Sequence, residues 1–194
     1  MKRIAQIKRK TKETDIELEL NLDGRGEAEV VTGVGFLDHL LTALARHARF
    51  DLKLTCKGDT QVDDHHTAED CALALGQAID RALGERRGIA RFGWAYAPMD
   101  EALARSSVDL SGRPFSVVGL RLSSERIGGL ASENAEHVIA TLADASRAAI
   151  HVDVLRGMND HHRAEAAFKA LALALRQAVT LDGSEDYPST KGVL

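Results

Sequence analysis

The chain has 194 residues, of which 44% are hydrophobic and 28% charged, and its formal net charge is −4. This length is enough for one core or for two small halves that share one. The acidic balance argues against general nucleic-acid binding, no apolar run is long enough to cross a bilayer, and the basic start lacks the apolar segment of a signal peptide. We therefore expect a cytoplasmic protein in which Cys56 and Cys71 are reduced thiols.

The first half of the chain alternates between strand-like and helix-like patterns. Apolar residues at every second position are typical of strands, and apolar residues three or four positions apart are typical of helices. Gly84 stands where a long helix should end. The expected elements, in chain order, are a β-hairpin around Gly24 and Gly26 at residues 14–33, a helix at 35–50, a strand at 50–58 and a helix at 64–84.

The second half repeats this order. Its patterns again predict a strand pair, a helix, a strand and a long helix. Residues 182–194 are expected to be irregular because Pro188 and Gly192 interrupt them. The expected elements are a strand pair turning at "SGRP" within residues 105–122, a helix at 133–147, a strand at 148–157 and a helix at 160–179.

Short landmarks indicate that the two halves are copies of each other. The string "DDHHTAED" at residues 63–70 returns as "NDHHRAEA" at 159–166, and "LDGR" at 22–25 returns as "LSGR" at 110–113. Two copies are too few for a solenoid, which needs at least three repeats, so they indicate a duplicated domain. Each half alone is close to the size at which a core is marginal, so the halves should pack together about a pseudo-twofold axis.

We therefore predict an α+β fold of duplicated half-domains, each with a β-sheet packed by two helices. The predicted halves are residues 1–88 and 89–194, joined near residues 84–93 and forming one compact unit.

Six of the eight histidines occupy repeat-matched positions, which suggests two equivalent metal sites. On a helix, residues four apart share a face, whereas neighbours point about 100° apart. The first histidine of each pair can therefore hold an ion together with the glutamate four residues later. The second histidine must point elsewhere, and it can complete the site of the other half. The predicted ligands are His39, His66, His161 and Glu165 for one ion, and His65, Glu69, His137 and His162 for the other.

The ligand types favour a transition-metal ion with open positions. Nitrogen and oxygen ligands without thiolate suit Mn²⁺, Fe²⁺ or Zn²⁺. A single pair of histidines on a helix is usually a surface feature, but its duplication with a matched upstream histidine makes metal binding the preferred interpretation. Of the remaining histidines, His151 is interpreted as structural and His47 as a candidate for substrate contact.

Longer stretches around these residues extend from residue 11 to the end of the chain: "TKET", "TGVGFLDHLL", "DDHHTAEDCALALG", "RRGIARFG", "PMDEALAR", "DLSGRP", "NDHHRAEAAFKALALALRQA" and "PSTKGVL". In these stretches the chain resembles the imidazoleglycerol-phosphate dehydratases, lyases of histidine biosynthesis. The resemblance implies a βαβ-type fold similar to ribosomal protein S5 domain 2, two Mn²⁺ per active site, and a homo-oligomer of twenty-four subunits with active sites between subunits. Relatives often carry Asp-Gln where this chain has Thr42 and Ala43.

The implied reaction converts D-erythro-imidazole glycerol phosphate into imidazole acetol phosphate and water. The proton to be removed is weakly acidic, because no carbonyl group stands beside its carbon. Binding of both ring nitrogens as a metal-bound imidazolate would let the ring expel the neighbouring hydroxyl and make that proton acidic. The resemblance suggests Glu13 as the general acid/base, and Glu69 and Glu165 could also move a proton besides binding metal.

The resemblance also implies the residues that bind the substrate. The phosphate needs cations, and the C-terminal "STK" segment would fold over the site as a substrate-binding tail. A small phosphorylated imidazole is thus the expected partner, with no nucleic acid and no membrane. The implied substrate-binding residues are Glu13, His39, His47, His65, Glu69, Arg91, Arg113, His161, Lys169, Ser189 and Lys191.

Two alternative functions fit the same histidines. A two-metal phosphate-ester hydrolase would hold its ions about 3.5–4 Å apart, often with a shared ligand. The separate ligand sets predicted here favour ions spaced by an imidazole ring. A metal store or sensor would not need the arginine, lysine and serine set for a phosphate.

Overall fold

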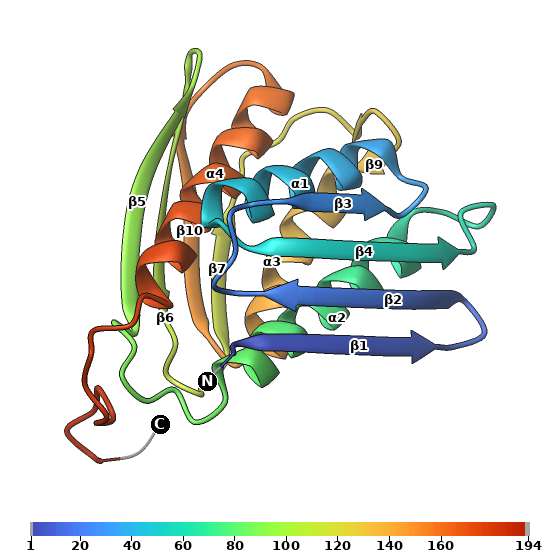
Figure 1. Cartoon of the computed structure of the whole chain (residues 1–194). Coiled ribbons are helices and arrows are strands. Elements are labelled where there is room, and N and C mark those ends of the chain that lie inside the picture. The colour runs from blue at the N-terminus through green and yellow to red at the C-terminus, as the bar shows by residue number, and fades with distance from the viewer. Residues whose placement is uncertain (1, 193–194) are drawn as a thin grey trace.

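The computed structural model describes residues 2–192. Within them, two four-stranded sheets flank four helices (Figure 1). The first sheet has the order β1 (Ile4–Lys10), β2 (Thr14–Asn21), β4 (Asp51–Gly58) and β3 (Ala28–Val31). The second has the order β5 (Phe92–Met99), β6 (Ala102–Asp109), β10 (Ala149–Arg156) and β7 (Phe115–Gly119). The helices are α1 (Gly35–Ala48), α2 (His65–Leu83), α3 (Ser132–Ala145) and α4 (Asp160–Ala178), and a small hairpin joins β8 (Arg126–Ile127) to β9 (Leu130–Ala131).

The two sheets have the same topology, which confirms the predicted duplication. Each half contains a strand, a helix and a parallel strand in this chain order, as β3–α1–β4 and as β7–α3–β10, with the β8–β9 hairpin inserted before α3. The predicted α+β fold with βαβ-type halves is therefore present. The predicted junction near residues 84–93 covers the connection between α2 and β5 and the first two residues of β5. Met1, Val193 and Leu194, at the outer ends of the predicted halves, lie outside the described residues.

The predicted hairpin at residues 14–33 is wrong in its pairing. Both strands exist, but β4 lies between them, antiparallel to β2 and parallel to β3. The reason is that β3 leads into α1, and a strand that continues through a crossover helix pairs in parallel with the strand after it. The predicted strand pair within residues 105–122 is wrong for the same reason, because β10 separates β6 from β7.

Two antiparallel hairpins, β1–β2 and β5–β6, were not among the predicted elements. Strands β1 and β5 are edge strands. Strand β5 contains Gly93 and Pro98, which weaken a strand pattern and are tolerated at a sheet edge. The turns of these hairpins carry Glu13 and Glu101.

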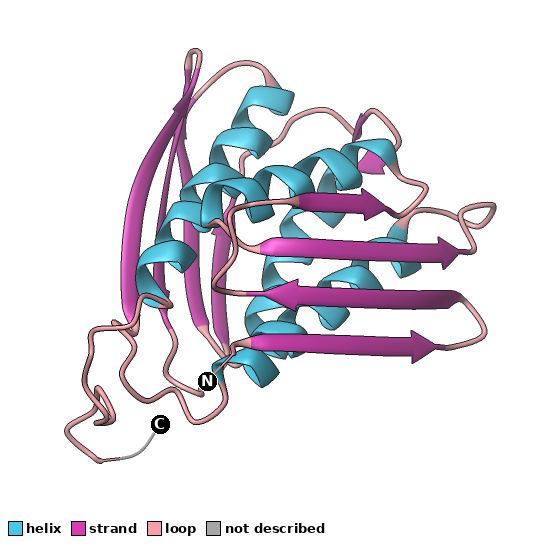
Figure 2. Ribbon diagram, viewed as in Figure 1, coloured by secondary structure: helices cyan, strands magenta, loops and turns pink. Residues whose placement is uncertain are grey.

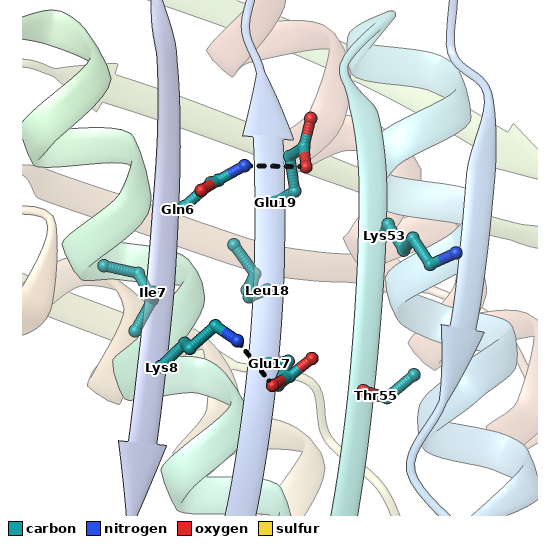
Figure 3. Close-up of a pocket in the computed structure, with 8 residues that line it drawn as sticks. All are labelled: Gln6, Ile7, Lys8, Glu17, Leu18, Glu19, Lys53 and Thr55. Carbon is teal, nitrogen blue, oxygen red and sulfur yellow. Dashed lines mark hydrogen bonds and ion pairs between the residues drawn. The ribbon is translucent and has the colours of Figure 1, made fainter.

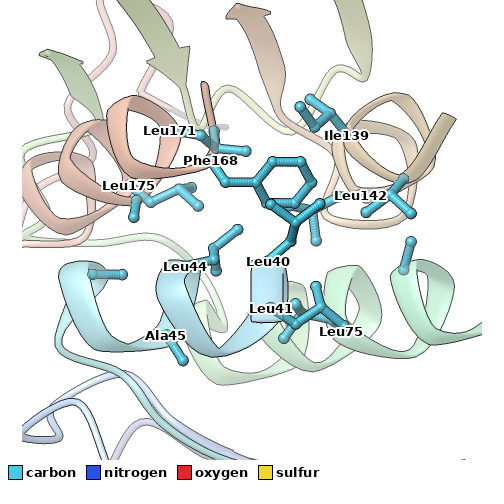
Figure 4. Close-up of a cluster of buried hydrophobic side chains, with 14 of the residues drawn as sticks. Leu40, Leu41, Leu44, Ala45, Leu75, Ile139, Leu142, Phe168, Leu171 and Leu175 are labelled. Carbon is cyan, nitrogen blue, oxygen red and sulfur yellow. The ribbon is translucent and has the colours of Figure 1, made fainter. Parts of the chain in front are cut away.

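The predicted helices are confirmed, and they form the core between the sheets (Figure 2). Helix α2 ends before Gly84, as expected, and the Gly84 N–H donates to the carbonyls of Asp80 and Arg81. Fully buried side chains from all four helices meet in one cluster (Figure 4), which includes Leu40, Leu41, Leu44, Leu75, Ile139, Leu142, Phe168, Leu171 and Leu175.

Helices from opposite halves pack on each other, and this positions the site. Helices α1 and α2 lie against the first sheet, while α3 and α4 lie against the second. Across the interior, α1 packs on α4 and α2 packs on α3. Each short helix therefore meets the long helix of the other half. No helix within residues 2–192 has both the length and the apolar character needed to cross a membrane.

Candidate active site

Cluster one, defined as His39, His161 and Glu165, brings both halves of the chain together. The His39 Nε2 atom lies 3.0 Å from Glu165 Oε2, and His161 Nε2 lies 3.2 Å from the same oxygen. His39 comes from α1, whereas His161 and Glu165 share one face of α4. The Glu165 side chain is 10% exposed, but the two imidazoles are 44% and 45% exposed. A buried carboxylate therefore anchors two imidazoles that remain open to solvent.

Cluster two, defined as His65, Glu69 and His137, is its counterpart. The His137 Nε2 atom from α3 lies 3.1 Å from Glu69 Oε1 on α2. The rings of His65 and His137 stack with their centroids 4.9 Å apart. The Nδ1 atom of His65 lies 3.0 Å from Asn134 Oδ1, and since a carbonyl oxygen only accepts, Nδ1 carries the proton in this bond. This leaves His65 Nε2 as a lone-pair donor.

Both clusters have the geometry and the chemistry of a metal site. In each of them, one ligand atom from every residue lies within 4.8 Å of the others. Two imidazole nitrogens and one carboxylate oxygen suit a divalent transition-metal ion. The residues therefore fit the expected ion, and the short helix of each half supplies a histidine to the cluster on the long helix of the other half.

Local hydrogen bonds explain why both motifs begin a helix. The Asn159 side chain accepts from the backbone N–H groups of His161 and His162, so it caps α4. In the first half, Asp63 accepts from the His65 N–H at 2.8 Å. The first turn of each long helix is thus fixed, and the histidine pair is presented in the same way twice.

The aspartate that precedes each histidine pair is buried and structural. Asp64 accepts from Arg126, from the Ala131 N–H and from the Asn134 side chain, at 2.6–2.8 Å. Asp160 accepts from the backbone N–H groups of Ser123 and Ser124 at 2.9 and 2.7 Å. Burial raises the pKa of Asp160, but these hydrogen bonds outweigh it and lower the pKa to about 2. Both aspartates therefore hold the segment between β7 and α3 against the starts of the long helices.

Hydrogen bonds from Lys169 and His39 keep Glu165 ionised. Burial raises the pKa of this carboxyl. Hydrogen bonds from Lys169 and His39 lower it by more than burial raises it, so that the pKa is about 2. The Lys169 Nζ atom lies 2.7 Å from Glu165 Oε1, one helical turn away. Lys169, predicted as a substrate ligand, is thus at cluster one. His47, predicted as a weaker candidate, lies in the last turn of α1, where burial and the charge of Lys169 lower its pKa.

The predicted fourth ligands, His66 and His162, are not in the clusters that they were assigned to. Each lies beside its neighbouring histidine, with ring centroids 6.1 Å from His65 and His161 respectively. Their Nδ1 atoms bond to carboxylates, Asp59 at 3.1 Å for His66 and Glu101 at 2.7 Å for His162. Within one chain each cluster therefore has three ligands, and the role of these two histidines stays a prediction.

Glu13 lies in the β1–β2 turn and is exposed. Its Oε1 atom is 3.7 Å from His66 Nε2. The equivalent turn of the second half carries Glu101, which also accepts the backbone N–H groups of Met158 and Asn159 at 3.1 and 2.9 Å. The hydrogen bonds from Asn159, His162 and Met158 lower the pKa of Glu101 to about 2. Glu101 is thus tied into the fold, whereas Glu13 is available for chemistry.

The resemblance assigned the phosphate to Lys169, at cluster one, and to four residues at the other end of α4: Arg91, Arg113, Ser189 and Lys191. The Arg91 N–H donates to the carbonyl of Ala178, the last residue of α4, and its guanidinium binds Asp109 and the Pro188 carbonyl. Ser189 and Lys191 follow Pro188, and Arg113 follows β6 at the same end. Since a helix rises 1.5 Å per residue, His161 is about 25 Å from this end. One chain therefore does not combine these four residues with cluster one.

Two other features lie away from the site. His151 stands exposed on β10, with its ring 6.2 Å from that of Phe115. A shallow hollow on the outer face of the first sheet is lined by Gln6, Lys8, Glu17, Glu19 and neighbouring residues (Figure 3). Hydrogen bonds join Gln6 to Glu19 and Lys8 to Glu17. No histidine and no predicted site residue lines this hollow.

The three residues that bond to the Nδ1 atoms of His65, His66 and His162 were not predicted: Asn134, Asp59 and Glu101. The repeat indicates that Glu101 is the counterpart of Glu13. The two glutamates are separated by the same number of residues as the matched strings "LDGR" and "LSGR". Asp59 has no such signal, and Asn134 becomes visible only once α3 is placed against α2.

Sequence comparison identifies the family to which this site belongs. A model of imidazoleglycerol-phosphate dehydratase matches residues 32–175, which include both clusters. The chain belongs to the imidazoleglycerol-phosphate dehydratase family. It is therefore a hydro-lyase of histidine biosynthesis. Membership of this family decides against the hydrolase and metal-store alternatives.

Individual members of the imidazoleglycerol-phosphate dehydratase family are similar along nearly the whole chain. A relative from Phytophthora nicotianae is 60% identical over 192 residues, which are 99% of this chain and 42% of that protein. The chain thus spans less than half of the Phytophthora protein. A relative from Zymomonas mobilis is 53% identical over 196 residues, with all of both chains covered.

Solved structures of imidazoleglycerol-phosphate dehydratases have the same fold. The enzyme from Pyrococcus furiosus, in complex with (S)-C348, superposes with a TM-score of 0.84 at 40% identity, covering 97% of this chain and 100% of that one. The enzyme from Staphylococcus aureus gives a TM-score of 0.81 at 34% identity, covering 92% and 99%. The duplicated α+β architecture is therefore that of the family.

Proposed function

We propose that this chain dehydrates D-erythro-imidazole glycerol phosphate to imidazole acetol phosphate, with two Mn²⁺ held by clusters one and two. The observation that carries this proposal is the pair of matched clusters, each with two imidazoles and one carboxylate contributed by both halves. Membership of the dehydratase family supports it. The substrate is a metabolite of amino-acid biosynthesis, and we propose the cytoplasm as the place of action.

Clusters one and two would each hold one ion. Mn²⁺ accepts mixed imidazole and carboxylate ligands, and three ligands from one chain leave further positions for His66 or His162 and for substrate. When bound, the ions supply the Lewis acidity that stabilises the substrate ring as an imidazolate. The chain itself keeps Glu165 ionised and fixes the proton of His65 on Nδ1 through Asn134.

Glu13 is the proposed general acid/base. Its carboxylate is exposed in a hairpin turn and lies beside His66, while the equivalent Glu101 is fixed by backbone hydrogen bonds. Glu13 can therefore move toward a substrate carbon and exchange its proton with solvent. In the proposed reaction it removes the proton from the carbon next to the one that loses its hydroxyl, and the resulting enol then tautomerises to the ketone. Glu69 and Glu165 would act mainly as metal ligands.

The phosphate would bind Arg113, Ser189 and Lys191, with Arg91 in support. The side chain of Arg113 has no hydrogen-bond or ion-pair partner within residues 2–192, so it is free to bind an anion. The Arg91 guanidinium instead bonds to Asp109 and to the carbonyl of Pro188, and it thereby supports the segment that leads to Ser189. Lys169 lies at cluster one and would act at the imidazole end of the substrate.

A complete active site therefore requires more than one copy of the chain. Cluster one and the phosphate residues lie at opposite ends of α4, about 25 Å apart, which exceeds the length of the substrate. We propose a homo-oligomer of twenty-four subunits, in which one subunit supplies a cluster and another supplies the phosphate contacts. His66 and His162 would complete clusters across the same boundaries.

The experiment that tests this function is a dehydration assay on the purified, metal-stripped chain. Imidazole acetol phosphate should form from D-erythro-imidazole glycerol phosphate after Mn²⁺ is added, and formation should stop when a chelator is added. Equal rates with and without Mn²⁺ would contradict the role of the clusters, and no product under either condition would contradict the function.

A further inference from the structure

His66 and His162 share a contact that the ligand prediction does not require. The Nδ1 atom of each ring lies within hydrogen-bond distance of a carboxylate, Asp59 at 3.1 Å for His66 and Glu101 at 2.7 Å for His162. A carboxylate accepts, so Nδ1 donates its proton. The Nε2 atom of each ring is then the remaining donor atom, and it faces the exposed side chains of Glu13 and Asp100, at 3.7 and 3.6 Å respectively.

The two carboxylates come from different places in the repeat. Asp59 lies in the connection between β4 and α2, whereas Glu101 lies in the β5–β6 turn. The repeat counterpart of Glu101 is Glu13, which in the first half faces the other ring nitrogen. The two halves thus reach the same Nδ1 contact with residues that are not equivalent. A contact merely inherited from duplication would use equivalent residues, so both histidines have a common requirement for it.

We propose that Asp59 and Glu101 are positioning residues, which hold His66 and His162 in the tautomer and orientation that leave Nε2 free to bind a metal ion. Histidine ligands commonly donate their other N–H to a carboxylate, which fixes the ring and increases its basicity. This inference rests on the proposed function, since it assigns these histidines to ions completed by a neighbouring copy. It also explains why Glu13 is free, because Asp59 performs in the first half the task that Glu101 performs in the second.

Glu101→Gln gives the sharpest test, because the two oxygens of this carboxylate have different hydrogen-bond partners. Oε1 accepts the backbone N–H groups of Met158 and Asn159, while Oε2 faces His162 Nδ1. In the variant, the backbone N–H groups of Met158 and Asn159 should still donate to the amide oxygen of Gln at this position. The NH₂ group of the amide should then face His162. The ring must then carry its proton on Nε2, where a metal ion would bind.

Binding of Mn²⁺ to the assembled variants is measured by the electron paramagnetic resonance signal of the free ion, together with thermal unfolding. Glu101→Gln should weaken binding by about 10- to 100-fold at unchanged thermal stability. Asp59→Ala should do the same, while Asp59→Asn, which keeps an oxygen for Nδ1, should restore most of the affinity. Glu17→Gln, a carboxylate of the β1–β2 hairpin that pairs with Lys8, is the matched control and should bind as the wild type does.

Wild-type affinity in Glu101→Gln and Asp59→Ala would overturn this inference while leaving the proposed function intact. Failure of the wild type itself to bind Mn²⁺ would instead contradict the proposed function. Equal loss of affinity in Asp59→Asn and Asp59→Ala would also overturn the positioning role, because the charge and not the Nδ1 contact would then be responsible.

Discussion

The Nε2 atom of His39 lies 3.0 Å from Oε2 of Glu165, and these residues come from opposite halves of the chain. In the other cluster the second half supplies the histidine and the first half the glutamate, with His137 Nε2 lying 3.1 Å from Glu69 Oε1. The duplication therefore produced two sites in which each half depends on the other. This dependence arises because α1 packs on α4 and α2 packs on α3.

Substitution of Glu13 should separate catalysis from metal binding. Glu13→Gln keeps the size of the side chain but cannot exchange a proton, so turnover should fall by about 10²- to 10⁴-fold. Folding and Mn²⁺ affinity should remain unchanged, because Glu13 is exposed and outside both clusters. Steady-state rates at saturating substrate measure the effect, with Glu17→Gln as the control, and turnover close to that of the wild type would remove Glu13 from the reaction.

Asn134 allows a test of whether a hydrogen bond to the Nδ1 atom of a predicted metal ligand, His65, supports metal binding. Asn134→Ala removes the oxygen that accepts from His65 Nδ1, although Asp64 keeps its bonds to Arg126 and to the Ala131 N–H. We expect the Mn²⁺ affinity of cluster two to fall by about 10- to 100-fold, which calorimetric titration measures. Asn21→Ala removes an amide that bonds to Asp51 in the first sheet and serves as the control. Equal affinities in the two variants would show that His65 does not depend on Asn134.

The chemistry of the site was more predictable from sequence than the pairing of the strands. The spacing of His161 and Glu165 on one helix face is a local property, and the repeat then associated His39 with them. Strand order depends on distant contacts: nothing in residues 14–33 indicates that β4 will lie between β2 and β3. For the same reason the pairing of Arg91 with Asp109 was not predicted, because this ion pair exists only in the folded chain.

Stability should depend on pH through Asp51. Burial raises the pKa of this carboxyl, but the backbone N–H groups of Arg25 and Glu27, with further hydrogen bonds, lower it overall. A lowered folded pKa means that Asp51 stabilises the fold above its unfolded pKa of about 3.9, and that this contribution is lost as pH falls through the folded pKa. Asp51→Ala should therefore reduce the free energy of unfolding at pH 7 by about 1–3 kcal/mol.

The difference between wild type and Asp51→Ala should shrink steadily below about pH 4, in denaturant titrations at a series of pH values. A difference that stays constant down to pH 2 would mean that the charge of Asp51 does not stabilise the loop at residues 25–27.

Gly76 is predicted to be essential for the packing of α2 on α3. A Cβ atom at this position would lie 2.6 Å from Ala145 Cβ and 2.9 Å from the Leu142 carbonyl oxygen. Gly76→Ala should therefore destabilise the fold by about 1–3 kcal/mol, despite the better helix propensity of alanine. Gly35→Ala, also helical but with no atom within 4 Å of the new Cβ, should stay within about 1 kcal/mol of the wild type. Chemical denaturation compares the two, and equal midpoints would contradict the close approach.

Complementation between two variants tests most directly whether one subunit supplies a metal cluster and another supplies the phosphate contacts. His161→Ala damages cluster one, and Arg113→Ala damages the opposite end of the molecule, so each variant alone should be nearly inactive. When the two chains are co-expressed and assemble at random, about one quarter of the sites should receive both intact parts and recover dehydratase activity. If the activity of the mixed assembly does not exceed the sum of the activities of the two separate variants, the active site is not divided between subunits.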